Sequence, residues 1–308
     1  MVDLSTQLGK IKLKNPVLAA SGTFGHAKEL EKFMDLTKLG GIVTKTITIK
    51  PRLGNPPQRI VETPSGMLNA IGLQNPGVEK FITDKLPYLR KLKVPIIVSV
   101  MGYTIKEFLA VVEKLEKEGG FDGYEMNLSC PNVSYQKATQ GARMFAHDPQ
   151  MIRDVVSAVR KITKRTLVAK LGPDVSDIAS MARATEEAGA DAVSLINTFM
   201  AMVIDVKTRK PVLGNKTGGL SGPCVRPIAV RMVWEVQKSV KIPVLGIGGI
   251  MNSRDALEFL IAGASAVQIG TANFMNPRAC EEIIHGIGDF MKEEKIKNLK
   301  ELIGSVKL

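Results

Sequence analysis

Short apolar runs that recur along the 308 residues constrain the fold of this chain more than any other feature. Each run precedes a turn signal and then a helical pattern. The runs are almost continuously apolar and do not alternate with polar residues, which is typical of strands that a parallel sheet buries on both faces. The predicted strands are residues 17–20, 42–45, 96–100, 123–127, 167–171, 192–197, 244–248 and 266–270.

Helical patterns separate these runs, and two of them carry clear boundary signals. Asp148 precedes Pro149, which places a capping residue before a proline at the first helical position, and Gly189 follows a helix end. Eight alternations of strand and helix favour a (β/α)₈ TIM barrel over an open doubly wound sheet. No linker, low-complexity tract or repeat interrupts the pattern, so we predict one domain over residues 1–308. The predicted helices include residues 104–118, 149–162, 175–188, 223–240 and 253–262.

Three long segments exceed what a barrel of about 250 residues needs. They span residues 46–77, 128–147 and 198–222, and each follows a predicted strand. We therefore expect them over the C-terminal face, where the active sites of barrels lie. Residues 4–14 alternate around a Gly-Lys pair and predict a small hairpin that closes the bottom of the barrel.

Composition excludes several classes of protein. Hydrophobic residues make up 44% and charged residues 23%, which is ordinary for a globular protein. The three cysteines, Cys130, Cys224 and Cys280, form no CxxC pair, so we expect no disulfide framework, metal site or iron–sulfur cluster on this chain. The N-terminus lacks an apolar signal-peptide core, and no stretch approaches the roughly 20 apolar residues of a membrane helix. We expect a cytoplasmic protein that does not bind membranes.

The net charge of +12 suggests an anionic ligand or partner. However, the lysines are scattered among acids, as in residues 113–118, and such runs are usually solvated helix faces. Four tyrosines and one tryptophan leave no basic stripe interleaved with aromatic residues, which argues against nucleic-acid binding. Either general lysine usage or a surface for an acidic partner explains the charge.

The last two predicted strands both end in glycine, in residues 246–250 (GIGGI) and 269–272 (IGTA). Glycine lets backbone N–H groups approach a phosphate closely, and barrels often bind phosphate with the loops after strands 7 and 8. Turn geometry explains any single glycine, but it explains the pairing less well. The pattern favours a ligand that bears a phosphate.

Polar residues gather at the same ends of the predicted strands. Lys45 and Lys170 each close an apolar run, and because lysine is rarely buried without a partner, we expect both to face an anion. Amides both donate and accept hydrogen bonds, which suits a planar ligand with ring N–H and C=O groups. The asparagines of this region are Asn69, Asn127, Asn132 and Asn197.

Cys130 lies in residues 126–132 (MNLSCPN), directly after a predicted strand. The proline that follows it cannot continue a central strand, so we expect the thiol on a loop. A buried structural thiol and a reactive one fit this heptapeptide equally, but the polar surroundings favour an acid–base role. A flavin mononucleotide (FMN) fits the phosphate and cation pattern, because a cation near the N1/O2 edge stabilises the anionic reduced flavin. The three histidines are dispersed and look incidental.

Five motifs resemble those of the dihydroorotate dehydrogenase family. They are MNLSCPN, LNAIGLQNPG (residues 68–77), INTF (residues 196–199), GIGGI and IGTA, and they occur in the family's order over essentially the whole chain. This chain has cysteine instead of serine as the base and lacks an N-terminal extension. In both respects it resembles class 1 of the family and not the membrane-associated class. LNAIGLQNPG and Asn197-Thr198 are similar to the NAD-linked catalytic subunit (class 1B), since fumarate-linked relatives typically have serine after that asparagine.

The resemblance implies oxidation of (S)-dihydroorotate to orotate in pyrimidine (UMP) biosynthesis. Cys130 would remove the proton from C5 of the substrate while hydride passes from C6 to N5 of FMN. It also implies a partner polypeptide that holds FAD and a [2Fe–2S] cluster and passes electrons to NAD⁺, around a homodimeric core within a heterotetramer.

The resemblance assigns site residues as well. Residues 128–147 would form a lid that excludes water during hydride transfer. The residues implied to hold the substrate are Lys45, Asn69, Ala70, Ile71, Gly72, Leu73, Asn127, Asn197 and Thr198, with Asn132 as an addition. The residues implied to hold FMN are Ser21, Lys45, Thr46, Ser99, Asn127, Lys170, Ile196, Gly222, Gly248, Gly249, Gly270 and Thr271.

Three alternatives stay open at this point. A dihydropyrimidine dehydrogenase shares the flavin barrel and a cysteine acid, but its substrates lack the carboxylate of orotate. A dihydrouridine synthase would need a tRNA-binding extension, which we do not find. A barrel that binds a phosphate ligand without redox chemistry belongs to a different class.

Overall fold

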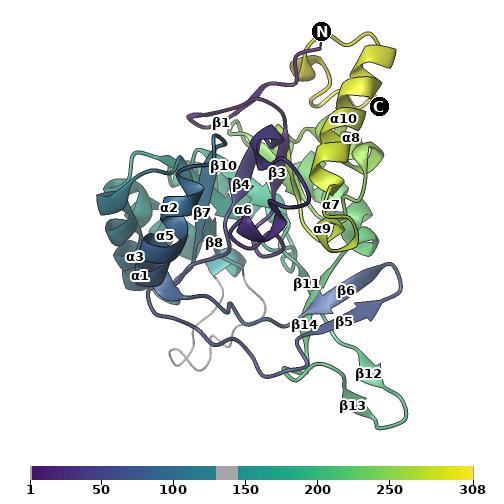
Figure 1. Cartoon of the computed structure of the whole chain (residues 1–308). Helices are drawn as coiled ribbons and strands as arrows, with labels where there is room; N and C mark the ends of the chain where they lie inside the picture. Colours follow the sequence, from purple (N-terminus) through teal and green to yellow (C-terminus); the bar gives the residue numbers. More distant parts are fainter. Residues whose placement is uncertain (1, 130–144, 308) are drawn as a thin grey trace.

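The computed structural model describes residues 2–129 and 145–307. Its centre is a closed barrel of eight parallel strands, which neighbour one another in chain order and close where the last strand pairs with the first (Figure 1). Helices surround the barrel, so the predicted (β/α)₈ architecture is confirmed. The barrel strands are β3 (Val17–Ala19), β4 (Gly41–Val43), β7 (Ile96–Val100), β8 (Gly123–Asn127), β9 (Thr166–Lys170), β10 (Ala192–Leu195), β15 (Val244–Ile247) and β16 (Ala266–Ile269).

The predicted strand bounds match β7 and β8, but six of the eight predictions run one or two residues too far at the C-terminal end. In β4, for example, the strand ends at Val43, and Lys45 already belongs to the following loop. The apolar runs continue past the last ladder pair because the strand ends are still buried. The chain leaves the sheet there and turns its polar side chains towards the barrel mouth.

Most connections between barrel strands contain an α-helix, but the first does not. In residues 20–40, which the structure describes throughout, the chain forms only the 3₁₀ helices η1 (Lys28–Leu30) and η2 (Leu36–Lys38). The prediction of eight strand–helix alternations was therefore wrong at this position. Gly22, Gly25 and Ala27 all have positive φ, so this segment turns repeatedly and cannot hold a regular helix.

The other connections are helical. The connection between β4 and β7 ends in three helical segments joined end to end, of which the middle one is a π-helical turn. The prediction for residues 175–188 began too early, because Asp177 caps the helix by accepting from Ser180 N. The prediction for residues 223–240 splits into a 3₁₀ turn and an α-helix. The helical segments are α1 (Gly77–Lys80), η3 (Phe81–Lys85), α2 (Leu86–Leu89), α3 (Ile105–Glu118), η4 (Phe145–His147), α5 (Pro149–Ile162), α6 (Ile178–Glu187), η5 (Pro223–Val225), α7 (Arg226–Gln237), α8 (Ser253–Ala262), α9 (Ala272–Met275), α10 (Ala279–Glu293) and η6 (Leu299–Glu301).

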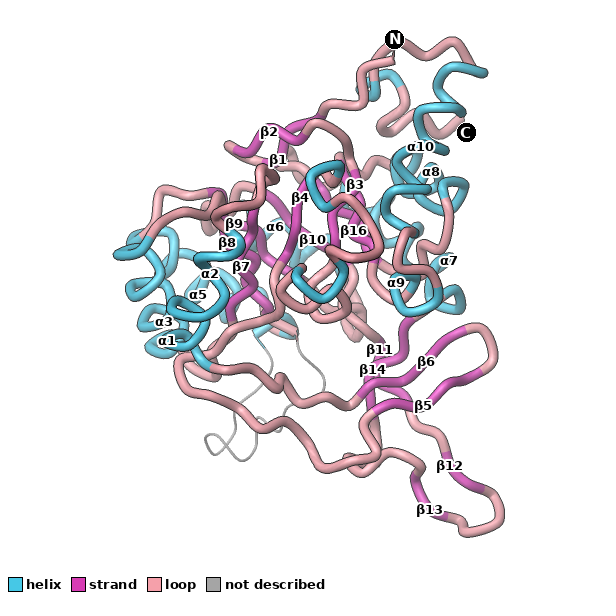
Figure 2. The backbone as a smooth tube through the Cα atoms, viewed as in Figure 1, coloured by secondary structure: helices cyan, strands magenta, loops and turns pink. Residues whose placement is uncertain are grey.

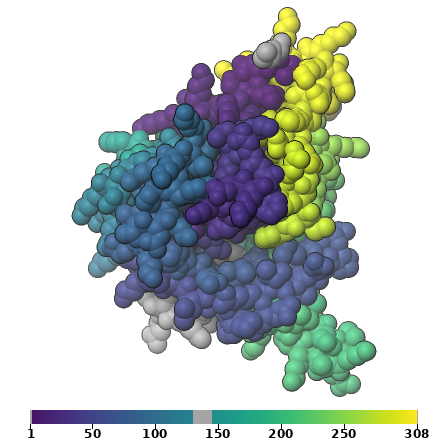
Figure 3. Space-filling view, in the orientation of Figure 1, coloured from purple at the N-terminus to yellow at the C-terminus, as the bar shows by residue number. Residues whose placement is uncertain are grey.

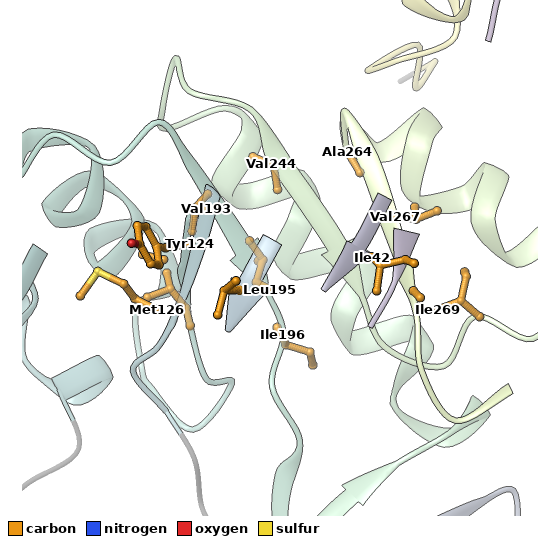
Figure 4. Packing of buried hydrophobic residues seen from close by; sticks show 14 of the residues in the cluster. Ile42, Tyr124, Met126, Val193, Leu195, Ile196, Val244, Ala264, Val267 and Ile269 are labelled. Atoms are coloured by element: carbon orange, nitrogen blue, oxygen red, sulfur yellow. The ribbon is translucent and has the colours of Figure 1, made fainter. Parts of the chain in front are cut away.

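The main hydrophobic core lies between the barrel and its helices. Side chains such as Tyr124, Met126, Val193 and Leu195 leave the strands and pack together there, and all four are fully buried (Figure 4). The alternate residues of the same strands point into the barrel. Both faces of every strand are thus covered, which explains why the strands are almost continuously apolar.

A hairpin closes the N-terminal end of the barrel, as the sequence predicted. β1 (Thr6–Leu8) pairs antiparallel with β2 (Ile11–Leu13), and both lie at the opposite end of the barrel from the β5–β6 strands (Figure 2). Leu8 and Leu13 are fully buried and pack with Leu18, Val43 and other side chains of the barrel interior. The hairpin therefore supplies part of the barrel core.

Two of the three long segments, which were predicted only as oversized loops, form a second sheet. β5 (Ile60–Thr63) and β6 (Gly66–Asn69) pair with β14 (Gly218–Ser221) and β11 (Phe199–Ala201) in an antiparallel sheet of order β11-β14-β6-β5. The short hairpin β12 (Ile204–Asp205) and β13 (Lys210–Pro211) extends away from the body of the protein (Figure 3). Most of the predicted lid, residues 128–147, lies outside the described residues.

One buried histidine lies in the first connection. The pKa of His26 is lowered to about 4, mainly by burial; Glu29 opposes this shift, and Lys85 and Lys45 contribute to it. Its ring packs at 5.5 Å from Phe81, so it is a neutral core residue. None of the helices within the described residues is long and apolar enough to span a membrane.

We predict that Leu13→Ala lowers the free energy of unfolding by about 2–5 kcal/mol, because it leaves a cavity in the barrel interior. Lys12→Ala, at an exposed position of the same strand, is the matched control and should change stability by less than about 0.5 kcal/mol. Urea unfolding measures both. Equal effects of the two substitutions would show that the hairpin is not part of the core.

We also predict that His26 makes the protein sensitive to mild acid. Its pKa in the folded state lies below the usual 6.5, so its contribution is complete above pH 6.5 and is lost as the pH falls towards 4. Over this range the wild type should lose up to about 3 kcal/mol more stability than His26→Gln. The control is His285→Gln, at an exposed histidine. Parallel pH profiles for wild type and His26→Gln would contradict the prediction.

Candidate active site

A cavity of about 260 Å³ lies at the C-terminal ends of the barrel strands. Its walls come from the loops after β3, β4, β10, β15 and β16, from the ends of β8 and β9, and from β6 and β14 of the second sheet. The volume is close to the lower end of the range for ligand sites, about 300–1,000 Å³. The polar side chains that the sequence placed at the strand ends therefore share one concave site.

A chain of hydroxyl groups forms one side of this site. Thr46 Oγ1 lies 2.9 Å from Ser99 Oγ and 3.3 Å from Ser21 Oγ. Asn127 Nδ2 donates to the same Thr46 oxygen at 3.4 Å. Ser99 is fully buried behind Thr46, so it supports the wall without lining the cavity.

Two amides are held in place on the adjoining wall. Asn197 Nδ2 donates to Asn127 Oδ1 at 3.2 Å and to the carbonyl oxygen of Ser129 at 3.1 Å. Asn197 Oδ1 accepts from Thr198 N at 2.9 Å, and Ser129 Oγ donates to the carbonyl oxygen of Lys170 at 3.3 Å. These contacts fix the orientation of both amides and anchor Ser129, the residue before Cys130, at the barrel mouth.

Lys170 has an anionic partner inside the protein. Its Nζ lies 3.7 Å from Oε1 of Glu125, which is fully buried in β8. Glu125 Oε2 accepts from Ser194 Oγ at 3.1 Å and from Gln268 Nε2 at 2.6 Å. Our sequence reasoning missed Glu125 and Gln268, although an acid or amide within an apolar strand is a usable signal.

Lys45 lines the cavity from the loop after β4. Its backbone N–H donates to the carbonyl oxygen of Gly25 at 3.0 Å, which ties it to the first connection. The two predicted lysines thus reach the same cavity from the ends of different strands.

The glycines of the site are of two kinds: some are required by the backbone conformation, and one leaves space in the cavity. Gly222, Gly248 and Gly249 have φ of 101°, 134° and 72°, a conformation that disfavours side chains whether or not a ligand binds. Gly270 has no positive φ, and the nearest atoms that an added Cβ would meet among the described residues belong to Ala20 and Thr23, at 3.7 Å or more. Packing within the protein would therefore admit alanine at Gly270. Because Gly270 lines the cavity, its missing side chain leaves space for a ligand there.

Most of the predicted site residues line the cavity. Ala70 and Ser99 are fully buried and do not, and neither does Gly222. Cys130 and Asn132 lie outside the described residues. The predicted residues that line the cavity are Ser21, Lys45, Thr46, Asn69, Ile71, Gly72, Leu73, Asn127, Lys170, Ile196, Asn197, Thr198, Gly248, Gly249, Gly270 and Thr271.

Sequence reasoning missed a further set of lining residues, most of which are apolar or come from the second sheet. Apolar side chains carry no chemical signal, and the pairing of β6 with β14 joins segments that are far apart in the sequence. The missed residues are Ala20, Gly22, Thr23, Ile60, Met67, Leu220, Ser221, Val225, Ile247, Ile250, Gln268 and Phe274.

The two described cysteines do not contribute thiols to the cavity. Cys280 is fully buried, and burial raises the pKa of its thiol to about 12. Cys224 is half-buried, and its Sγ lies 3.8 Å from the carbonyl oxygen of Ser221. Neither lines the cavity.

Known proteins are similar to this chain over its whole length. The family model for dihydroorotate dehydrogenase matches residues 3–291. A relative from Geotalea uraniireducens (strain Rf4) is 52% identical over 304 residues, which cover 99% of this chain and 98% of that protein. A relative from Thermodesulfovibrio yellowstonii is 53% identical over 304 residues, which cover 99% of each chain. Both are named dihydroorotate dehydrogenase B (NAD(+)), catalytic subunit.

Proposed function

The chain belongs to the dihydroorotate dehydrogenase family, and from this we propose how its own residues oxidise dihydroorotate to orotate in pyrimidine biosynthesis. It is an oxidoreductase whose relatives are NAD-linked catalytic subunits. The observation that carries the proposal is the cavity at the barrel mouth, where Lys45, Lys170, Asn127 and Asn197 meet next to Ser129.

We propose FMN as the cofactor of this cavity. The space at Gly270 suits a group that approaches the backbone closely. The buried Gln268 Oε1 has no hydrogen-bond partner among the described residues, which suits a ligand with a donor group. When bound, FMN would accept a hydride from the substrate. The loops at Gly248, Gly249, Gly270 and Thr271 would hold its phosphate. The residues proposed to hold the rest of the cofactor are Ser21, Lys45, Thr46, Asn127, Lys170 and Ile196, while Ser99 and Gly222, which do not line the cavity, would support its wall from behind.

The substrate is a planar ring with amide groups and a carboxylate, and the remaining polar residues match it. Asn127 and Asn197 would pair with the ring amides, since their own contacts already fix their orientation. Lys45 would provide a cation for the carboxylate. The other residues proposed to hold the substrate are Asn69, Ile71, Gly72, Leu73, Asn132 and Thr198, and Ala70, which is fully buried, would support this segment from behind the cavity wall.

Cys130 is the proposed general base that removes the proton from C5 of dihydroorotate. A free cysteine has a pKa of about 8.5, so its surroundings must favour the thiolate or let it accept the proton as the hydride leaves C6. Ser129 is anchored to Asn197 and to the backbone of Lys170. This supports the role of Cys130, because the residue before it is held beside the asparagine side chains that would bind the substrate.

The electrons are proposed to reach NAD⁺ through a separate subunit. The relatives' designation as catalytic subunits of an NAD(+) enzyme supports a partner that completes the reaction. Three dispersed cysteines give this chain no cluster motif of its own, so FAD and a [2Fe–2S] cluster would belong to that partner. We propose a homodimer of this chain within a heterotetramer.

We predict that the chain reconstituted with FMN is yellow and that anaerobic dihydroorotate bleaches the flavin absorbance. Dihydrouracil, which lacks the carboxylate, should bleach it far more slowly. A protein that stays colourless after reconstitution would contradict the proposed cofactor, and faster reduction by dihydrouracil would point to a dihydropyrimidine dehydrogenase.

The same preparation tests the electron acceptor. The chain alone should transfer electrons from dihydroorotate to an artificial acceptor but not to NAD⁺. Adding a subunit that carries FAD and [2Fe–2S] should restore NAD⁺ reduction. Rapid NAD⁺ reduction, or efficient fumarate reduction, by the chain alone would contradict the proposed division between two subunits.

We predict that Cys130→Ala retains FMN but slows flavin reduction by dihydroorotate about 10²–10⁴-fold, the usual contribution of a positioned acid–base group. Stopped-flow absorbance measures the rate. Cys224→Ala is the matched control, because this thiol does not line the cavity, and its rate should stay near that of the wild type. A near-normal rate in Cys130→Ala would rule out the cysteine as the base.

A further inference from the structure

We propose that Glu125 is the counter-charge of Lys170 and limits how strongly this lysine favours reduced over oxidised FMN. The proposal rests on the FMN site proposed above. Glu125 does not line the cavity and acts only through its neighbours, so it is a positioning residue and not a catalytic one.

Strand register places Glu125 directly beneath the site. In the parallel pair of β8 and β9, Asn127 lies opposite Lys170, and Glu125 lies opposite Val168, two residues earlier on each strand. Residues two apart on a strand share a face, so Glu125, Asn127, Val168 and Lys170 all point into the barrel. The carboxylate is therefore one layer deeper than the ammonium group that lines the cavity.

Side chains from three strands besides β8 contact this carboxylate: Ser194 on β10, Gln268 on β16 and Lys170 on β9. Both hydrogen bonds, from Ser194 on β10 and from Gln268 on β16, go to Oε2. Within the part of the chain that the structure describes, Oε1 accepts no hydrogen bond, and it lies 3.7 Å from Nζ of Lys170. The arrangement turns one oxygen towards the lysine and uses the other to fix the side chain.

Stability alone does not account for the pair. Glu125 is fully buried and Lys170 is only 7% exposed, and removing two charges from water costs about as much as their attraction returns. Apolar residues fill the same interior elsewhere, for example Leu18, Val43 and Val168. The lysine of this pair lines the cavity, and the carboxylate lies beneath it. Both charges therefore act electrostatically on a ligand in the cavity, which apolar residues would not do.

The sign of this effect follows from the charges. A cation beside the cavity stabilises an anionic reduced flavin, and a fixed negative charge behind that cation offsets part of its field. The offset is substantial in an interior of low dielectric, where solvent screens little. Glu125 therefore holds the flavin at a lower reduction potential than Lys170 alone would give.

The test compares Glu125→Gln with the wild type, each as the FMN-bound protein, by equilibrating it with a redox dye of known potential. The amide keeps the shape of the side chain but removes its charge. We expect the preference for reduced over oxidised FMN to rise at least about tenfold, which corresponds to a shift of about +30 mV for a two-electron couple. An unchanged or lower potential would overturn the proposal.

Ser194→Ala is the matched control, because it removes a hydrogen bond to the same carboxylate and changes no charge. Its potential should equal that of the wild type. A shift as large as that of Glu125→Gln would assign the effect to disturbed packing, and this too would overturn the proposal. A wild type that binds no FMN would instead contradict the proposed function itself.

A second measurement serves if Glu125→Gln fails to fold or to bind FMN. Lys170→Met leaves the buried carboxylate without its cation, whereas Lys170→Met combined with Glu125→Gln removes both charges together. We expect the double variant to be more stable than Lys170→Met when the FMN-free proteins are unfolded in urea, because an unpaired buried charge is strongly destabilising. Equal stability, or a less stable double variant, would show that the two charges are not coupled.

Discussion

Every strand of the barrel is covered on both faces, and the rest of the structure depends on this double burial. Helices pack against the outer face, while the interior is filled by inward side chains and by Leu8 and Leu13 of the β1–β2 hairpin. A polar group in such a strand must find a partner or reach an open end. The hairpin closes the N-terminal end, so the polar side chains of the strand ends gather at the C-terminal mouth, where they share one cavity.

The second sheet completes this mouth. β6 and β14 come from segments about 150 residues apart and pair so that Gly219 lies opposite Asn69. The sheet has a small core of its own around Leu68, Ala70 and Leu213, which holds the two segments together over the barrel. Asn69 therefore reaches the cavity from a sheet that is separate from the barrel strands, and the site needs both layers.

Glu125 is an acidic side chain in a mostly apolar interior. It is fully buried, and its partners come from three other strands: Lys170 from the neighbouring β9, Ser194 from β10 and Gln268 from β16, on the far side of the closed barrel. The same closure that excludes water strengthens the interaction between the two charges. A fold that tolerates few buried polar groups thus places one ion pair directly beneath its ligand cavity.

The amino-acid sequence by itself determined the barrel, the closing hairpin and the lysines and asparagines at the strand ends, because apolar runs and strand-end residues are local properties of the chain. Lys45, Lys170, Asn127 and Asn197 could be placed at the mouth in this way, since parallel strands all end at the same edge. Only the tertiary structure decided that residues 46–77 and 198–222 form one sheet, that the first connection lacks an α-helix and that Glu125 faces Lys170. The sheet and the ion pair depend on contacts between segments that are distant in the sequence, and the first connection turns at Gly22, Gly25 and Ala27 through backbone conformations that an apolar pattern does not report.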